Sequence, residues 1–599
     1  MQAARLTQVA TSAIVRQAAR GGAALTGRWR RLSGPGDRSV AWAVTAALIV
    51  LVGLPLAAML AHLALPQLYL GSLQLGNFDL FSDLWERSLW RNAVRNSLLL
   101  GLGTMVLGAA IGVGLAWMRH HWRFPGSGLI DFSAWFVLVM PSFIIAQGWV
   151  LFARSGGTAS LLGIPWAGDV IFSLPGLILV MSLANFPLAY LAFSAALQWD
   201  VSRYEHAARL SGARPWTVFR AIRLPLLLPA LLAAGILVFV DTIGDFGLPA
   251  AFISVFRFPL IPYVIRTEIQ TVPVSFEGAA VLAAVLVSMV AVAIAIQIRV
   301  LRGGGRDFLT AAATPRQRPR PRFWPLLSAI TFAFLGLAVF APLGTSLSVS
   351  FMERYGAGLS WDNLTLANYQ AVLSSGSALL PALKNSFGIA FAAAGIALVI
   401  GFLAAYLLAY SGHRLRRFID VASTVTLAVP GIVLAVGYIF WWNQRWLADI
   451  GIQVYGSAWA IILCSAAASV PIAVRVLLGA MSQTPGSFLS SAALQGAGLW
   501  TRIRAILLPL TLSGLLSAGL AVFATSVFDL AITTMLQPPG FPTIPVIIDE
   551  RFRTVQYEWA TAATVVVCLI TAAVIVTVRF TARRLFRSYF ETTTETSRS

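Results

Sequence analysis

The stretch Y-E-H-A-A-R-L-S-G-A-R-P-W-T-V-F-R-A-I-R-L-P-L occupies residues 204–226, between two strongly apolar segments. A second stretch, S-S-A-A-L-Q-G-A-G-L-W-T-R-I-R-A-I-L-L-P-L at residues 490–510, repeats it. Both copies contain the pattern G-A-x-x-W-T-x-x-R-A-I-x-L-P-L. Two long matches of this kind predict a chain built from two similar halves.

The local structure of each copy follows from its glycine and its proline. In the first copy we expect short helices at 206–210 and 216–222, broken at Gly212, because glycine permits the backbone angles of a tight turn. Pro225 and Pro509 are expected to open the next apolar helix, where a missing N–H group is harmless. The pattern predicts a helix–turn–helix lying on one face of the protein, with an exposed part that fits a groove on a partner protein.

Further matches around the two copies keep a constant spacing. Up to the third apolar segment the spacing is 289 residues, and beyond it the spacing is 284. The matched positions are Asn96-Ser97 with Asn385-Ser386, Pro141 with Pro430, Pro187 with Pro471, Gly212 with Gly496, Pro225 with Pro509, and Asp245 with Asp529. Polar residues and prolines held at one spacing indicate a parallel internal repeat rather than chance similarity of apolar segments.

The composition places this repeat in a membrane. The 599 residues are 58% hydrophobic and 11% charged, with a mean hydropathy of +0.79, whereas soluble chains carry roughly a quarter charged residues. A membrane-spanning helix needs about 20 apolar residues. Twelve segments meet this requirement, at 42–64, 95–118, 130–153, 172–196, 226–249, 278–300, 324–347, 386–410, 418–442, 457–478, 509–532 and 559–580. We therefore expect an all-α polytopic membrane protein with twelve spans in two parallel six-helix repeats.

The arginines predict the orientation, because cytoplasmic loops carry an excess of positive charge. Arginines are concentrated before the first span and after every second span, for example at Arg119, Arg203, Arg302, Arg414, Arg502 and Arg579. Both termini and both copies of the motif are therefore predicted to be cytoplasmic, in a multi-pass protein of the bacterial inner membrane. The net charge of +20 is explained by topology, so no nucleic-acid partner is expected.

These spans predict the domain organisation. The expected parts are a cytoplasmic extension at 1–40, a first domain at 41–300 with the loop 200–225, a linker at 301–323, a second domain at 324–580 with the loop 482–509, and a tail at 581–599. The Arg-rich extension also has the composition of an organellar transit peptide, although a disordered cytoplasmic segment is the favoured interpretation.

Several kinds of site are not expected in this chain. Lys384 is the only lysine and lies in A-L-K-N-S-F, so the G-x-x-x-x-G-K-[ST] loop that cradles ATP phosphates is absent from the sequence. If ATP drives this protein, ATP and Mg²⁺ must bind a separate subunit. Cys464 and Cys568 lie in apolar segments and predict neither a disulfide nor a metal site. We expect no catalytic residue, no bound cofactor and no resident metal.

The repeated motif resembles the EAA loop of ABC importer permeases, which consists of E-A-A, a glycine and then I-x-L-P. The first copy has His206-Ala207-Ala208 with Glu205 one position early, whereas the second has Ser490-Ser491-Ala492 and no acid. The resemblance implies a type I ABC importer permease fold and a loop that docks an ATPase subunit. The coupling residues it implies are Glu205, His206, Ala207, Ala208, Gly212, Arg220, Pro225, Ala492, Gly496, Arg504 and Pro509. Because the second loop lacks the acid, the two docking sites are expected to be unequal.

The resemblance also implies partners and a cargo. Two permease domains in one chain look like the ferric-iron importers, and also like the related thiamine and aminoalkylphosphonate systems. The implied partners are two copies of an ATPase subunit, a periplasmic substrate-binding protein and the lipid bilayer. Ferric iron is the favoured cargo, while thiamine and a phosphonate remain alternatives.

Two other classes of protein compete with this interpretation. A secondary transporter with six-plus-six spans would need ionisable residues within its spans, and such residues are scarce here. A membrane-embedded enzyme would need a ligand or catalytic motif, but the five histidines form no H-E-x-x-H pattern.

A small group of acids is the candidate translocation pathway. Asp241 and Asp245 lie four residues apart, which predicts one helical face, and Asp529 repeats Asp245. One interpretation is that these acids end the fifth and eleventh spans at the outer interface. The alternative is that they line the outer mouth and attract a hard cation. Arg257 and Arg266 in the next outer loop leave an anionic cargo open.

Overall fold

The computed structural model describes residues 35–65, 81–197, 202–253, 255–303 and 318–596. In these residues the regular structure is helical, with one isolated bridge between Met352 and Leu364. Ten of the described helices are long and apolar enough to cross a membrane, and two bent helix pairs raise the number to twelve if each pair is one span. The structure therefore confirms an all-α polytopic protein.

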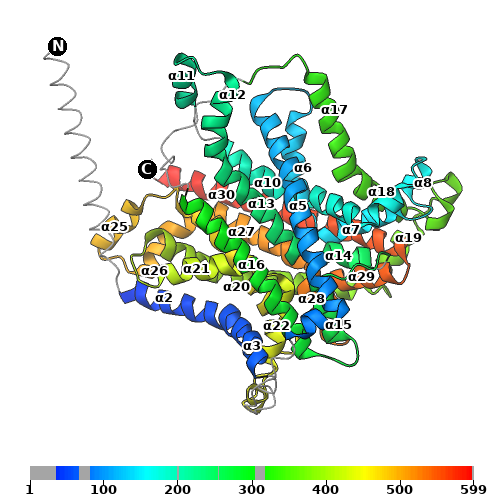
Figure 1. The fold of residues 1–599 in the computed structure, drawn as a ribbon. Helices are drawn as coiled ribbons and strands as arrows, with labels where there is room; N and C mark the ends of the chain where they lie inside the picture. Colours follow the sequence, from blue (N-terminus) through cyan, green and yellow to red (C-terminus); the bar gives the residue numbers. More distant parts are fainter. Residues whose placement is uncertain (1–34, 66–80, 198–201, 254, 304–317, 597–599) are drawn as a thin grey trace. The chain divides into compact units, whose positions relative to one another are not determined.

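The ten unbent spans of the described chain each contain at least 24 residues. In chain order and with the labels of Figure 1, they are α2–η1–α3 (Pro35–Leu48, Ile49–Gly53, Leu54–Ala64), α5 (Ser88–His121), α10 (Leu174–Leu197), α12–η4–α13 (Pro215–Val218, Phe219–Arg223, Leu224–Gly244), α16 (Phe276–Gly303), α17–η5–α18 (Trp324–Leu335, Gly336–Phe340, Ala341–Ser350), α20 (Leu379–Tyr410), α24 (Ala458–Met481), α26–η8–α27 (Leu499–Arg502, Ile503–Leu507, Leu508–Val527) and α30 (Tyr557–Thr596).

The predicted extension at 1–40 and the linker at 301–323 lie largely outside the described residues. The predicted tail at 581–599 continues α30 as far as Thr596. The proposed domain boundaries remain predictions.

The third and ninth predicted spans are bent pairs rather than continuous helices. Helix α6 (Ser127–Val139) meets α7 (Ser142–Ala153) at 104°, and α21 (Arg416–Ala428) meets α22 (Gly431–Trp442) at 110°. Pro141 and Pro430 stand at the two breaks with extended ψ angles of 133° and 139°. Proline lacks the N–H group that a continuous helix needs and also disfavours helical geometry in the preceding residue.

Four described spans contain a π-helical turn just before a proline. The turns η1 and η5 precede Pro55 and Pro342, and η4 and η8 precede Pro225 and Pro509. In every case the proline is the second residue after the π segment. A wider turn accommodates the proline ring and its missing hydrogen bond without ending the helix. The matched turns confirm the repeat at the level of backbone geometry.

The first span of each half packs on the bent pair of the other half. Helix α3 packs on α22, and α18 packs on α7. At these contacts Gly148 and Gly437 leave no room for a side chain: an added Cβ atom would lie 2.2 Å from the Pro342 carbonyl oxygen and 2.8 Å from that of Pro55. The recurrence of glycine at both positions therefore reflects close backbone approach.

By its internal contacts the chain divides into two compact units. One contains the described part of Met1–Gly53 together with Ala392–Leu427 and Ala466–Phe523. The other contains Leu54–Phe391, Ala428–Ser465 and the described part of Ala524–Ser599. Both units are held by close helix packing at small residues. A Cβ atom on Gly112 would lie 2.6 Å from the Phe186 carbonyl oxygen, and one on Gly401 would lie 2.6 Å from Ala473 Cβ. Small residues of this kind let membrane helices approach closely.

Candidate functional site

The first copy of the motif folds as a helix, a glycine turn and a second helix. Helix α11 (Ser202–Leu210) ends in a turn in which Gly212 has φ +82°. The Gly212 N–H group donates to Arg209 O, and the Ala213 N–H group donates to Ala208 O, both at 3.0 Å. This pair of bonds is the Schellman motif, which satisfies carbonyl groups at the end of a helix. The turn therefore fixes how the chain leaves α11.

The second copy makes the same turn with different residues. Helix α25 (Gly486–Leu494) is followed by Gly496, which has φ +84°. The Gly496 N–H group donates to Ala493 O, and the Ala497 N–H group donates to Ala492 O, again at 3.0 Å. A Cβ atom on Gly212 or Gly496 would meet no other atom within 4 Å. Glycine is required there for its backbone angle and not for space.

The second helix of each loop corrects one prediction. We expected Pro225 and Pro509 to open the spans, but the helices already begin at Pro215 and Leu499. They run through η4 and η8 into α13 and α27, with the expected opening prolines inside the helix. The glycine turn of each loop is therefore connected to the fifth or eleventh span by continuous helix.

The acid of the first loop faces inward. Glu205 is 3% exposed, and both of its carboxylate oxygens accept hydrogen bonds from the Arg223 guanidinium group, one of them at 3.1 Å. The same guanidinium group lies 3.2 Å from His121 Nε2 and 5.3 Å from the centre of the Trp117 ring. This cluster joins α11 to the start of α13 and the end of α5.

The missing acid of the second loop has an internal explanation. At a spacing of 284 residues, Glu205 corresponds to Leu489 and Arg223 corresponds to Leu507. Both leucines are buried, at 4% and 0% exposure. An ion pair in one half is thus replaced by two apolar residues in the other, a change that buried sites tolerate well when both partners change.

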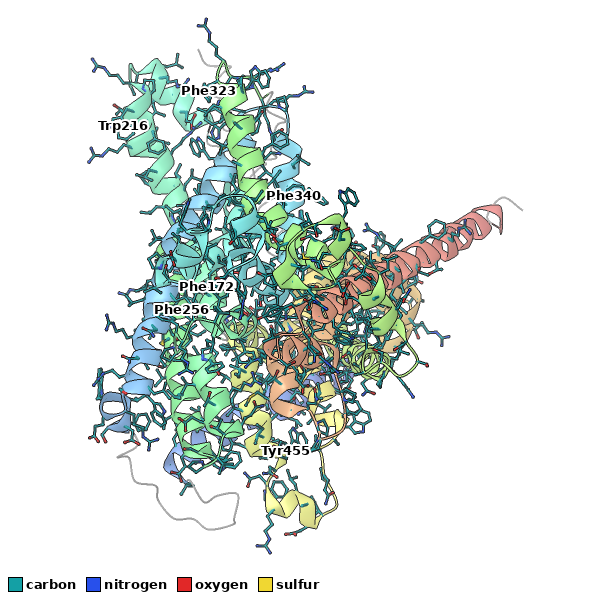
Figure 2. The ribbon with its side chains drawn as sticks, turned by 90° about the vertical axis from the view of Figure 1, so that its right-hand side faces the viewer. Phe172, Trp216, Phe256, Phe323, Phe340 and Tyr455 are labelled. Atoms are coloured by element: carbon teal, nitrogen blue, oxygen red, sulfur yellow. The ribbon has the colours of Figure 1, made fainter. Side chains whose placement is uncertain are left out.

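Each loop exposes a leucine and a tryptophan that the sequence analysis did not single out. Leu210 and Trp216 are 90% and 68% exposed, and their counterparts Leu494 and Trp500 are 79% and 66% exposed. Figure 2 shows Trp216 on the part of the chain that carries α11 and α12. The signal was available, because both pairs repeat at a spacing of 284 residues. Large apolar side chains exposed at matched places indicate contact with a partner protein.

The remaining predicted loop residues differ in exposure. Ala207, Arg220 and Arg504 are exposed, whereas Ala208 and Ala492 are partly buried. The backbone of His206 lies in α11, and its side chain lies outside the described part of the structure. The exposed surface of the first loop thus combines small, apolar and basic residues.

Two of the three predicted pathway acids act as helix caps. Asp245 Oδ1 accepts hydrogen bonds from Ser142 Oγ and Gly247 N, both at 2.8 Å, at the start of α14 (Gly247–Ile253). Asp529 Oδ1 accepts from Ile532 N at 2.9 Å at the start of α28 (Leu530–Leu536). These contacts match the interpretation in which the acids end the spans. Within the described residues, no three His, Cys, Asp or Glu side chains are grouped so that they could hold a metal ion.

Asp241 differs from the other two acids because it is exposed within α13. Gly244 lies three residues further along and hence on a neighbouring part of the same face. A Cβ atom on Gly244 would lie 3.2 Å from Pro430 Cγ, at the break of the bent pair in the second half. The face of α13 that carries Asp241 therefore adjoins Pro430, at the break between α21 and α22.

The repeated Asn-Ser pair positions a helix in each predicted outer loop. Ser97 Oγ accepts from Ile261 N at 3.0 Å at the start of α15 (Ile261–Gln270), and Asn96 Nδ2 donates to Pro259 O. In the second half, Ser386 Oγ accepts from Ile544 N at 2.9 Å at the start of α29 (Ile544–Arg553), and Asn385 Nδ2 donates to Pro542 O. The repeat thus places α15 and α29 equivalently.

A charged cluster with a buried carboxylate joins these two helices. We call Arg266, Asp549 and Arg553 the outer cluster. Asp549 Oδ2 lies 3.8 Å from Arg266 Nη1 and accepts from Arg553 Nε at 2.8 Å. Both groups lose solvation when the cluster forms. This burial raises the pKa of Asp549 and lowers the pKa of Arg266. Sequence reasoning missed this cluster because Arg266 lies far from Asp549 and Arg553 in the chain.

A further bond supports the contact between the halves. Gln270 Oε1 accepts from Arg266 Nε at 2.6 Å, and Gln270 Nε2 donates to Thr534 O at 2.9 Å. The predicted outer side is therefore held by polar contacts between the halves. Polar contacts of this kind can be exchanged for water when the halves separate.

Comparison with known proteins agrees with this architecture. The family described as "Binding-protein-dependent transport system inner membrane component" matches residues 107–302 and again 397–589. A probable ABC transporter permease of Sinorhizobium fredii is 25% identical over 544 residues, covering 89% of this chain and 93% of that protein. A ferric transport system permease of Actinobacillus pleuropneumoniae is 24% identical over 80% of this chain and 70% of its own length.

A shorter relative matches one domain. The molybdenum transport system permease of Escherichia coli K12 is 32% identical over 212 residues, which is 34% of this chain and 90% of that protein. The double match, the paired loops and the helical repeat lead to one conclusion. The chain belongs to the family of binding-protein-dependent transport system inner membrane components and carries two copies of the family's domain in one polypeptide.

Proposed function

We propose that this ABC importer permease moves ferric iron, delivered by a periplasmic binding protein, into the cytoplasm. In this proposal each of the two loops docks one copy of an ATPase subunit, and the partner subunits bind ATP and Mg²⁺. The observation that carries the docking part of the proposal is the pair of matching glycine turns, each flanked by an exposed leucine and tryptophan. Fully burying one such leucine in a partner's groove stabilises a complex by about 1.5–3 kcal/mol.

The continuous helix from each loop into its span is the proposed route of coupling. Movement of a docked ATPase would be transmitted through α12, η4 and α13 in the first half, and through α26, η8 and α27 in the second. The Glu205–Arg223 contact makes α11 move with this helix. Leu489 and Leu507 serve the same purpose in the second half through apolar burial.

The outer cluster is the proposed closed gate on the side where the binding protein docks. This assignment rests on the orientation predicted from the arginines, which places α15 and α29 outside. Separation of the two halves would break the Arg266–Asp549 and Gln270–Thr534 contacts. Residual charge in the opened gate would then be positive, since the cluster holds two guanidinium groups and one carboxylate.

Asp241 is the proposed cargo contact within the pathway. It is exposed on the face of α13 that adjoins Pro430, whereas Asp245 and Asp529 are engaged as caps. A carboxylate is a suitable ligand for a hard cation. The resemblance to ferric transport permeases over most of the chain supports iron as the cargo.

A second cargo is favoured by the outer cluster. Arg266 and Arg553 carry a net positive charge at the gate, and guanidinium groups recognise oxyanions well. The molybdenum permease relative supports an anionic cargo of this kind. A phosphonate belongs to the same chemical class.

Uptake by vesicles that contain the permease, its ATPase and its binding protein tests both cargoes. We expect labelled ferric iron to accumulate with wild type and to fall several-fold in Asp241→Asn. Asp529→Asn is the matched control, because an amide oxygen can still accept from Ile532 N. Uptake of molybdate or phosphonate without iron would select the second cargo, and full iron uptake by Asp241→Asn would remove its role in the pathway.

A further inference from the structure

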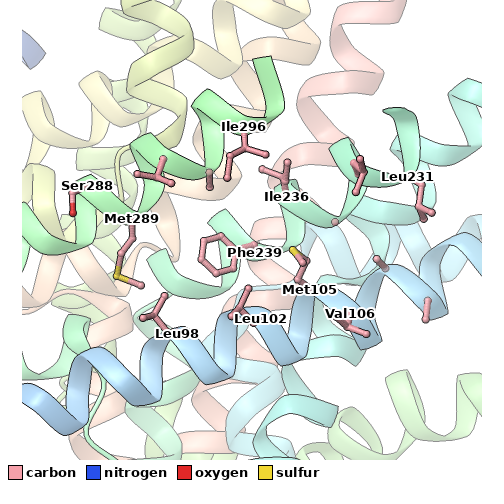
Figure 3. Close-up of a pocket in the computed structure, with 16 residues that line it drawn as sticks. Leu98, Leu102, Met105, Val106, Leu231, Ile236, Phe239, Ser288, Met289 and Ile296 are labelled. Atoms are coloured by element: carbon pink, nitrogen blue, oxygen red, sulfur yellow. The ribbon is translucent and has the colours of Figure 1, made fainter. Parts of the chain in front are cut away.

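The first half contains an apolar groove of about 700 Å³ between three spans, α5, α13 and α16 (Figure 3). Leu98 and Met289 lie near one end of the groove, and Leu231 lies near the other. Its lining is apolar apart from Ser288. All three helices are candidate membrane spans, so the groove lies at the depth of the hydrocarbon core.

The groove lies on the side of α13 opposite its contact with Pro430. Gly235 is in its lining, and Gly244 contacts Pro430 of the second half. These glycines are nine residues apart on α13, which is two and a half helical turns, so they lie on opposite faces. The rim is exposed, with Val106 at 66% and Val292 at 59%. In a bilayer, an exposed apolar surface on this side meets lipid chains.

The side chains between the matching helices α20 and α27 of the second half are larger. Ala109 and Ala110 line the groove, and their counterparts at a spacing of 289 residues are Leu398 and Val399. A Cβ atom on Gly519, the counterpart of Gly235, would lie 3.0 Å from Leu398 Cδ1, whereas a Cβ atom on Gly235 would lie 3.3 Å from Met105 Cγ and 3.9 Å from the Ala109 Cβ atom. Small side chains on α5 therefore open the groove in the first half.

A basic residue stands beyond one end of the groove. Ile296 is in the lining, and Arg299 follows it three residues later on α16, on the same side of the helix and exposed. This end of α16 leads to the linker predicted to be cytoplasmic. An arginine at such a membrane boundary attracts the phosphate of an anionic lipid.

We propose that this groove is a binding site for one acyl chain of an anionic phospholipid of the cytoplasmic leaflet, with Arg299 contacting the headgroup phosphate. The apolar lining accepts the chain, the exposed rim admits it from the bilayer, and the arginine selects the headgroup. An unfilled groove would forfeit the dispersion contacts of its lining.

Photolabelling of the full-length permease in phosphatidylcholine vesicles tests the site. The probes are phosphatidylglycerol and phosphatidylcholine that carry the same photoactivatable acyl chain, and labelled peptides are mapped by mass spectrometry. We expect wild type to be labelled by the phosphatidylglycerol probe on groove-lining peptides of α5 and α16. Arg299→Gln should lower the preference for the phosphatidylglycerol probe about fivefold.

Two filling variants make the test specific to the groove. Ala109→Leu introduces the side chain that the second half carries. Ala110→Phe fills the groove from an exposed position, so no buried side chain has to move. Both should abolish groove labelling while labelling elsewhere on the lipid-facing surface is kept. Equal labelling by both probes would overturn the headgroup assignment, and unchanged labelling in Ala110→Phe would overturn the site.

Discussion

Replacing the Glu205–Arg223 pair tests how the first loop is held. In Glu205→Leu the Arg223 side chain, only 18% exposed, loses both carboxylate contacts and keeps His121 and the Trp117 ring. Removing one partner of a buried pair costs about 3 kcal/mol. That corresponds to about a hundredfold decrease in the equilibrium constant for docking of α11.

The double variant Glu205→Leu with Arg223→Leu should behave differently. It copies Leu489 and Leu507 of the second half and leaves no charge unpaired. We expect its loop to recover to within about 1 kcal/mol of wild type. The reverse exchange, Leu489→Glu alone and then with Leu507→Arg, supplies the matched pair in the second loop.

Hydrogen exchange of residues 202–210 measures docking of α11, and binding-protein-stimulated ATP hydrolysis by the assembled complex measures its consequence. We expect rapid exchange and weak stimulation in Glu205→Leu, and near-normal values in the double variant. If the single and double variants behave alike in both measurements, the inward ion pair does not hold the loop and the reasoning is refuted.

Three further predictions concern the turn, the docking surface and the gate. Gly212→Val and Gly496→Val should each add about 1–2 kcal/mol of backbone strain and lower the ratio of uptake to ATP hydrolysis. Gly498→Ala, at φ −65°, should leave this ratio unchanged. Wild-type coupling in both valine variants would count against the role of the turn. Leu210→Ser should weaken the affinity for the ATPase about thirtyfold, as expected from about 2 kcal/mol of lost burial, so that less ATPase co-purifies while membrane insertion stays normal. Undiminished recovery of the ATPase would exclude the leucine from the interface. Arg266→Gln should raise basal ATP hydrolysis without binding protein about fivefold, from about 1 kcal/mol of lost pairing. Arg551→Gln, on α29 but outside the outer cluster and bonded to Gln556, is the control, and an equal rise in both variants would contradict the gate.

Much of the fold could be predicted because hydropathy, arginine placement and repeat spacing are local or periodic signals. The bends at Pro141 and Pro430 were not predicted, since the residues on both sides are equally apolar and only the backbone reveals the 104° and 110° angles. Conversely, Pro225 and Pro509 were expected to begin helices, but a π-helical turn before each proline lets the helix continue through it. A proline in the sequence does not by itself show whether the helix bends or continues at that position.

The site was predictable where it repeats and not where it depends on long-range packing. The glycine turns follow from the matched Gly212 and Gly496. Glu205 faces inward because it pairs with Arg223, which lies on the next helix. The buried Leu489 in the other half shows that this position is buried in both loops. Arg266 and Asp549 are matched positions, each five residues after the first residue of its helix, but the spacing alone does not show that the two side chains touch.

Site-specific disulfide crosslinking tests the central claim that both loops dock an ATPase subunit. Leu210→Cys and Leu494→Cys, each in a chain with Cys464 and Cys568 replaced by alanine, would be co-expressed with the ATPase carrying single cysteines in its surface groove. Trp361→Cys, 90% exposed in a predicted outer loop, is the control. The account predicts a crosslinked product from each loop and none from the control. An intact complex with no crosslink from either loop would contradict it.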